Sequence, residues 1–496
     1  SKTCLNDGKM TNSFSLPTYR SLETNRSWSF VYQTTRAAPQ PIRSFTTGVS
    51  ANSAVPQTIS AQVTVGGILD TNGVNQGQEV FFDISDIEGG TQIVLGLSFD
   101  ASHLKSGVYR SNIRLFIQFN QSNVGLILPG RLQIINEQDS PFGAGWLLDG
   151  LRKLAIDSQT GSVLWISSDG NHQTYTTFPD TVGFLTPNAN FATLIEGGGY
   201  AYTHTDKFGQ KSHYNSQGLM VASTDRNDNI TTFSYGPNQQ LQSITDPVGL
   251  ITTLTYAAGR MRSITDPAGR VTQFRHDSNG NLIEVIYPDS SRRAYEYDNH
   301  LMVKKTDERG NISEYQYDVF KRNVSATLPD GTSRLIRNQS SVGLINVNSG
   351  VGTEANPAKY IIEEQSDATY FDARGSRSTS VLDSHSRVLQ SVDEVGRVTQ
   401  YTRDNNSLAI RTTRPNGSVV NSTYDLKGNI LDSTEQFNAA ATSYEYDDFS
   451  LVTSITNPRN HTTTYNRDPD TGNLLSVVNH LGHATSYQYD TRGLVT

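Results

Sequence analysis

Residues 306–318 read TDERGNISEYQYD, and residues 479–490 read NHLGHATSYQYD. Both stretches carry a glycine, four variable positions and then Tyr-x-Tyr-Asp, close to a polar turn. In a β-strand, side chains two positions apart point to the same face. Tyr315 and Tyr317 are therefore expected on one face of a strand, and the polar residues between and before them on the other. The pattern predicts a strand with one aromatic face, entered and left through turns.

The turn beside this strand recurs along the chain at a nearly fixed interval. Copies of Asp-x-x-Gly, or close variants of it, begin at residues 206, 225, 246, 266, 307, 372, 393, 414, 457 and 479. The gaps between the first four copies are 19, 21 and 20 residues. Short turns at Tyr287 and Leu328 and a degenerate unit near Glu435 fill empty positions. A fixed period of roughly 20–50 residues indicates an array of small units.

Each unit has two halves and is expected to form a β-hairpin. The second half follows G-x-L-x-x-I-T, as in the near matches at residues 280–286 and 240–245. A DSNG turn at Asp277–Gly280 joins the halves, and turns such as D-P-x-G lead to the next hairpin. The Asp after the tyrosines is expected to accept backbone N–H bonds. The tyrosines of neighbouring hairpins are expected to stack, at roughly 0.2–1 kcal/mol a contact. We prefer this structural role to a catalytic one.

The whole pattern, G-x-x-x-x-Y-x-Y-D-x-x-G-x-L-x-x-x-T-D-P-x-G, resembles the tyrosine–aspartate (YD) repeat of Rhs proteins, Tc-toxin C subunits and teneurins. Residues 136–148, NEQDSPFGAGWLL, and residues 161–174, GSVLWISSDGNHQT, are similar to the segment that leads into bacterial Rhs shells. The resemblance covers roughly residues 139–496. It implies a hollow β-shell, which encloses a C-terminal toxic domain in bacterial members and serves adhesion in teneurins.

Two departures from the family pattern lead us to expect a fragment. The family's C-terminal plug, with its aspartate-dependent self-cleavage, is not in this chain, so no enzymatic activity is expected. Residues 492–496, RGLVT, stop inside the second half of a repeat. About two dozen strands spaced by about 4.8 Å make a path of about 115 Å, which closes about one turn of a barrel roughly 37 Å wide. The array is therefore expected to be truncated after its opening turn.

The fold class expected is all-β, in three parts. Residues 11–135 form an immunoglobulin-like β-sandwich that acts as a plug or spacer, residues 136–200 lead into the shell, and residues 201–496 form the hairpin array. Six strand-like runs predict the sandwich: residues 27–34, 57–65, 79–84, 92–99, 109–119 and 125–135. Residues 346–364 break the period, as a protruding recognition loop or a tolerated surface insertion.

Composition and charge exclude several classes of protein. The chain has 496 residues, 40 basic and 48 acidic, with no basic block, so nucleic acid is not expected as a partner. The single cysteine, Cys4, excludes an internal disulfide framework. It is either a lipidated or intermolecular thiol or an incidental residue. No apolar run is long enough for a transmembrane helix.

No motif assigns catalytic, cofactor-binding or metal-binding residues. P-loop, dinucleotide-binding, H-E-x-x-H and G-x-S-x-G patterns are absent from the sequence. His480 and His483 are spaced H-x-x-H, but without a third ligand nearby they are read as a surface pair. Residues 225–229, DRNDN, resemble a calcium loop but lack its glycine and distal glutamate. Residues 197–199 are three glycines that precede no expected helix.

The leading hypothesis is a non-enzymatic container in a secreted or cell-surface protein. Its partner would be a C-terminal toxin or effector domain of the same parent chain. The alternative is an adhesive or structural surface protein, whose partners would be a cell-surface receptor or neighbouring shell segments. A carbohydrate-binding or carbohydrate-degrading protein is a third hypothesis, based only on the aromatic and carboxylate-rich surface. The reading frame downstream of Thr496 would distinguish the first two hypotheses.

Overall fold

The computed structural model describes residues 2–3, 8–48, 54–177, 183–187, 190–337, 343–362, 367–383, 387–436 and 441–496. Within these residues the regular elements are strands, apart from the short helix α1 (Thr34–Ala37) and the 3-10 turn η1 (Val347–Ser349). The all-β class is therefore confirmed.

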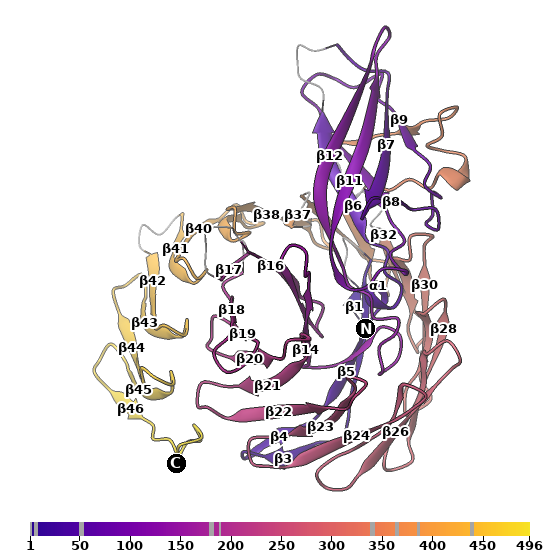
Figure 1. Cartoon of the computed structure of the whole chain (residues 1–496). Helices are drawn as coiled ribbons and strands as arrows, with labels where there is room; N and C mark the ends of the chain where they lie inside the picture. Colours follow the sequence, from indigo (N-terminus) through magenta and orange to yellow (C-terminus); the bar gives the residue numbers. More distant parts are fainter. Residues whose placement is uncertain are drawn as a thin grey trace.

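One antiparallel sheet of 27 strands contains the hairpin array. Each strand pairs with the next one along the chain, and only β33 and β34 are left out of the succession. Figure 1 shows this ribbon curling from magenta β18–β22 past β28 and β32 to yellow β42–β46. The spiralling array of hairpins expected from the repeat is present. Its strands are β18 (Thr193–Glu196), β19 (Tyr202–Thr205), β20 (Lys211–Tyr214), β21 (Met220–Thr224), β22 (Ile230–Tyr235), β23 (Leu241–Thr245), β24 (Ile251–Ala257), β25 (Arg260–Thr265), β26 (Val271–His276), β27 (Leu282–Ile286), β28 (Arg292–Asp298), β29 (Leu301–Thr306), β30 (Ile312–Tyr317), β31 (Asn323–Thr327), β32 (Ser333–Arg337), β35 (Asp367–Phe371), β36 (Arg377–Leu382), β37 (Val388–Val392), β38 (Val398–Arg403), β39 (Ala409–Thr413), β40 (Val419–Tyr424), β41 (Ile430–Glu435), β42 (Ala441–Tyr446), β43 (Val452–Thr456), β44 (Thr462–Arg467), β45 (Leu474–Val478) and β46 (Ala484–Ser486).

The repeated Asp closes its turn through its own carboxylate. Asp307 Oδ1 accepts the backbone N–H of Arg309 and of Asn311, both at 2.9 Å. Gly310, in the same turn, has φ +80°, a conformation that L side chains rarely adopt. The role expected for the Asp is therefore observed, and Gly310, directly after the first donor Arg309, is required by the backbone conformation.

The second tyrosine of the motif bonds to the backbone of the preceding hairpin. Tyr317 donates its hydroxyl hydrogen to the carbonyl of Met302 at 2.7 Å, a residue 15 positions earlier. The same bond recurs at four further tyrosines, namely Tyr235, Tyr256, Tyr424 and Tyr489. Where the motif has Arg403 and Arg467 instead, the guanidinium Nε donates to the carbonyl 15 residues earlier. Seven units therefore place a long hydrogen-bond donor here, whether or not it is aromatic, whereas Leu382 holds the position in another unit without a donor.

Most hairpins also carry a bulge at this position, whereas the pairing of β32 with β35 is continuous. The strand register shifts between Glu296 and Tyr297, and again between Gln316 and Tyr317. The same shift precedes the equivalent residue in the later hairpins, such as Arg403. Because a β-bulge bends its strand and increases local twist, a bulge in most units is consistent with a curling sheet.

Stacking between the tyrosines of neighbouring hairpins, which the sequence suggested, is not what joins them. Among the described residues, no aromatic ring pair links the repeat tyrosines of two units. The reason is spacing: equivalent strands are two ladder steps apart, about 9.6 Å, whereas ring pairs have centroids at about 4.5–7 Å. The intervening strand supplies the contact instead, since Phe233 lies opposite Ile244 and Phe274 opposite Val285.

The ribbon completes about one turn, as its strand spacing predicted, and its ends then meet. Lys207 Nζ donates to Asn429 Oδ1 at 3.2 Å across 222 residues of sequence. Asn473 Nδ2 donates to Asn227 Oδ1 at 2.7 Å across 246 residues. Arg226 also lies over the ring of Phe449. Turns on one edge of the first hairpins therefore contact turns on the opposite edge of the last ones.

Two smaller sheets line the inside of the curl (Figure 1). The first, here the inner sheet, consists of β1 (Lys2–Thr3), β2 (Met10–Ser15), β5 (Ser29–Gln33) and β13 (Trp146–Leu148). A two-stranded pair, β3 (Tyr19–Ser21) and β4 (Thr24–Arg26), lies between β2 and β5 in sequence. The second sheet holds β14 (Arg152–Ile156), β15 (Val163–Ser167), β16 (His172–Thr177) and β17 (Phe184–Leu185).

The sandwich stands outside the curl and begins later than residue 11. One of its sheets contains β6 (Ile42–Gly48) and β10 (Gln92–Ser98). The other contains β7 (Thr58–Val65), β8 (Ile68–Leu69), β9 (Val80–Asp83), β11 (Gly107–Gln118) and β12 (Asn123–Ile134). Strands β2 and β5 belong to the inner sheet instead, because Met10, Phe14 and Phe30 are buried against the hairpins rather than in the sandwich.

Residues 343–362, here the strap, leave the hairpin array and complete the sandwich. β33 (Ala358–Lys359) pairs in parallel with β9, and β34 (Ile361–Ile362) pairs antiparallel with β10. Val347 and Ala358 are buried in the sandwich core. The described part of the irregular segment is therefore neither a protruding loop nor a simple surface insertion, because its apolar residues are needed to complete both sheets.

Replacing Tyr317 with Phe tests the bond to the previous hairpin. The change leaves the Met302 carbonyl without its donor and should lower the free energy of unfolding by about 1 kcal/mol. Urea unfolding followed by fluorescence measures it. Tyr401→Phe is the control, because no hydrogen bond from its hydroxyl is found in the described structure, and its effect should stay below about 0.5 kcal/mol. Equal losses in the two variants would contradict this role.

Ala358→Asp tests the strap. A carboxylate placed in the sandwich core lacks a partner there, so we expect a loss of at least about 2 kcal/mol and faster protease cleavage within residues 343–362. Lys359→Ala is the matched control: it removes only the exposed ion pairs with Asp83 and Asp86, worth at most about 1 kcal/mol. Unchanged cleavage in Ala358→Asp would show that the strap does not hold the sandwich.

Candidate functional site

The concave face of the first hairpins is apolar and is covered by the inner sheet. Phe14 and Trp146 of the inner sheet lie edge to face at 5.2 Å between centroids. Trp146 contacts Tyr295 at 5.2 Å, and Phe30 contacts Phe274 at 5.4 Å. These rings belong to one buried cluster that spans the inner sheet and the hairpins. The first tyrosine of the motif therefore contributes to a core shared between the ribbon and the inner sheet.

All three tryptophans of the chain bind this ribbon through their indole N–H. Trp28 Nε1 donates to Thr252 Oγ1 at 3.1 Å. Trp146 Nε1 donates to Tyr297 Oη, and Trp165 Nε1 to Tyr214 Oη, both at 2.9 Å. Each indole fills apolar space and also satisfies its own polar group, as a buried tryptophan requires. These bonds fix the register of the inner sheets against the hairpins.

The later hairpins have a different concave face. At the position of the first tyrosine, the early units bury Phe233, Leu254, Phe274, Tyr295 and Tyr315. The later units carry, at the equivalent position, side chains that are only half-buried, namely Tyr401, Ser422, Tyr444, Tyr465 and Tyr487. Residues opposite these positions are Thr412, Ser433, Ile455 and Val477. This second stretch is therefore aromatic and hydroxyl-rich, and among the described residues no strand of the inner sheets pairs with it.

A buried histidine lies where β19 meets β15. The ring of His204 stacks on Trp165 at 4.7 Å between centroids. Its Nε2 is buried and has no hydrogen-bond partner in the described structure. Burial, with a smaller contribution from Arg152, lowers the pKa of His204 to about 4. His213, held between the hydroxyls of Thr203 and Thr224 at 3.1 Å each, also has a pKa lowered by burial.

The histidines noted in the sequence do not converge. His480 stacks on His461 at 4.1 Å, whereas His483 lies next to the side chain of Asn479. In the part of the chain that the structure describes, no three His, Cys, Asp or Glu side chains gather as metal ligands. The ring pair could not have been foreseen from sequence, because it joins turns of two neighbouring hairpins.

The remaining sequence candidates take structural positions. Asp225 accepts backbone N–H bonds from Asn227 and Asn229, so DRNDN forms an ordinary repeat turn. The asparagines of this turn contact the last hairpins. Asn229 Nδ2, for example, donates a hydrogen bond to the carbonyl of Arg492. Residues 197–199 connect β18 to β19. Cys4 lies outside the described residues. None of the helices described is long and apolar enough to cross a bilayer.

The chain is a repeat protein in which a curled sheet of β-hairpins surrounds smaller inner sheets. The comparison with protein families gives the same class. The family model described as RHS Repeat matches residues 214–251, 237–271 and 256–292. This part of the chain therefore consists of Rhs repeats, as the YD pattern indicated. No curated protein matches the sequence.

Solved structures with similarity to the chain come from Tc toxins. One is the pore of a Photorhabdus luminescens Tc holotoxin, at 12% identity over 98% of this chain and 27% of that chain, with a TM-score of 0.34. Another is a crystal structure of TcdB2–TccC3, at 13% identity over 78% of this chain and 23% of that one, with a TM-score of 0.29. The chain spans about a quarter of the length of these proteins.

The buried histidine predicts a loss of stability in acid. The folded pKa of His204 lies below its unfolded value, so its contribution is complete above about pH 6.5 and is lost as the pH falls toward 4. We expect a loss of about 2 kcal/mol between about pH 7 and 5, a range above most carboxylate titrations. Urea unfolding at each pH measures it. His204→Phe keeps the stacking ring and should make the profile shallower, while His213, His276 and His300, whose pKa values burial also lowers, keep part of the slope. An unchanged profile would exclude His204 as a cause.

Proposed function

We propose that this chain is part of an Rhs-type shell that encloses a C-terminal toxin or effector polypeptide of the same parent protein, secreted or displayed at the cell surface. It acts as a wall and has no catalytic activity of its own. The observation that carries the proposal is the division of the concave face into a sealed apolar stretch and an uncovered aromatic, hydroxyl-rich stretch.

The two stretches suit different tasks. The first is closed by the inner sheet and the tryptophan bonds, and it gives the wall a buried core. The second offers half-buried tyrosines among Ser and Thr, which give contact area and hydrogen bonds without a deep pocket. Such a surface can lie against a polypeptide of varied sequence, since tyrosine is rigid and amphipathic. The Rhs repeats at residues 214–292 support the same reading.

An adhesive function is the second candidate, and one feature of the sandwich favours it. β12 is an edge strand of its sheet. It carries the exposed apolar residues Val124, Leu126 and Ile127, the last 62% exposed. A long exposed edge strand of this kind can pair with a strand of another protein. In this case the shell would present the sandwich to a receptor.

Limited proteolysis of the full-length parent protein tests the container. The polypeptide downstream of the repeats should be cut at least about tenfold more slowly than the same polypeptide produced alone, because the wall excludes the protease. Cleavage at the rate of the free polypeptide would reject encapsulation. The same experiment on Ile127→Lys tests the edge of β12. If the enclosed polypeptide is still cut as slowly as in the wild type, the exposed edge of β12 is not needed for encapsulation and serves another role.

A further inference from the structure

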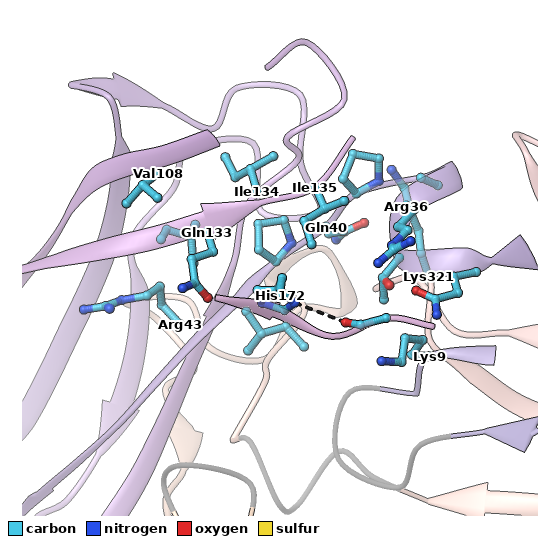
Figure 2. Close-up of a pocket in the computed structure, with 18 of the residues that line it drawn as sticks. Lys9, Arg36, Gln40, Arg43, Val108, Gln133, Ile134, Ile135, His172 and Lys321 are labelled. Carbon is cyan, nitrogen blue, oxygen red and sulfur yellow. Dashed lines mark hydrogen bonds between the residues drawn. The ribbon is translucent and has the colours of Figure 1, made fainter. Parts of the chain in front are cut away.

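A cavity of about 850 Å³ lies between the sandwich and the shell. Four parts of the molecule build it: the chain from Lys9 to Ser44, strand β12 with Arg131 and Gln133, Gly170 with strand β16, and the hairpin turn at Phe320–Arg322. Figure 2 shows Arg43 and Gln133 on one side of His172, and Lys9, Arg36 and Lys321 on the other. The cavity is therefore lined from both bodies that the strap connects.

The lining is positively charged, although the whole chain has a net charge of −8. Among the described residues, it contains six basic side chains and no Asp or Glu: Lys9, Arg36, Arg43, Arg131, Lys321 and Arg322. Carboxylates outside the lining pair with two of them, Asp100 with Lys321 and Asp318 with Arg322. Arg36 donates to the carbonyls of Ser167 and Ser168.

Two of the arginines in the lining have N–H groups that could bind an anion. Within the described chain, neither Arg43 nor Arg131 forms an ion pair with a carboxylate. Arg43 donates one Nη to the Arg131 carbonyl at 3.3 Å, but its Nε is buried without a partner. A guanidinium in this state favours an oxyanion, which accepts two parallel N–H bonds from it.

Gln33 provides an independent indication of a ligand. This side chain lines the cavity and is only 1% exposed. Both its amide atoms, Nε2 and Oε1, have no hydrogen-bond partner in the described protein. It lies over Gly170 beside the Lys9 ammonium. An unpaired buried amide costs about 1–3 kcal/mol, so a bound oxyanion that accepts from Nε2 would recover part of this cost.

We propose that this cavity binds a small phosphate-bearing anion with two or more phosphate groups. Its volume is within the range of small-molecule sites, roughly 300–1,000 Å³. One phosphate lies between Arg43 and Arg131 of the sandwich, and another reaches Gln33 and Lys9 of the shell side. The ligand thereby ties the sandwich to the shell, next to the strap. This inference does not depend on what the shell encloses.

Binding of inorganic pyrophosphate to this chain, measured by calorimetry and by the shift in unfolding temperature, tests the proposal. We expect saturable binding and a higher unfolding temperature. Arg131→Ala should weaken binding about tenfold, the loss of one charge-assisted contact. Arg114→Ala is the matched control: it is an exposed arginine on the neighbouring strand β11, outside the cavity, and its affinity should stay within about twofold.

Gln33→Met gives a second readout that a structural role would not produce. Met is of similar size and has no amide to leave unpaired, so the free protein should be as stable as the wild type or more stable. Pyrophosphate binding should nevertheless weaken. No binding at millimolar pyrophosphate, an equal effect of chloride at the same ionic strength, or equal weakening by Arg114→Ala would each overturn the proposal.

Discussion

The apolar concave face of the early hairpins must be removed from water, and this requirement organises the molecule. A single-layer ribbon has no second sheet of its own repeats to cover it, so residues 8–37 and 140–148 supply the cover. The cover is bonded as well as packed, because the tryptophan N–H groups meet shell hydroxyls. Where the cover ends, the repeat keeps its turns and its backbone bonds but carries only Tyr and Ser where the first units carry Phe, Leu or Tyr. The composition of the inner face thus follows what lies against it.

Curvature and cohesion come from a second feature, which recurs in many of the units. A bulge precedes the second tyrosine position in most hairpins, and in seven units the side chain at this position donates to a carbonyl 15 residues earlier. The substitution of Arg403 or Arg467 for tyrosine keeps the donor and the bulge. Where it is present, a long side chain with a polar end therefore joins one unit to the preceding one, and aromatic stacking between units contributes little because equivalent strands are too far apart.

The strap explains how the sandwich is held in place beside the hairpin array. Hairpins pair only with the next hairpin, so the array alone cannot position a separate domain. The departure of residues 343–362 from the ribbon gives strands to both sheets of the sandwich. This fixes the sandwich beside the shell and brings Arg131 of one body and Gln33 of the other to the same cavity.

The sequence alone determined the repeat unit, its turns and the all-β class, because a hairpin of about 21 residues is built from contacts between residues close in the chain. Asp307 and Gly310 could be assigned their roles from the turn pattern. Five of the six strand runs expected in residues 11–135 form strands of the sandwich, and the run at residues 27–34 forms β5 of the inner sheet. Its aromatic residues fit either place, and only the tertiary structure shows that their partners are Phe274 and Tyr297. The burial of the strap, the contact between Asn227 and Asn473, and the basic cavity likewise join residues far apart in the chain. No local pattern encodes such pairs, since they depend on how far the ribbon curls.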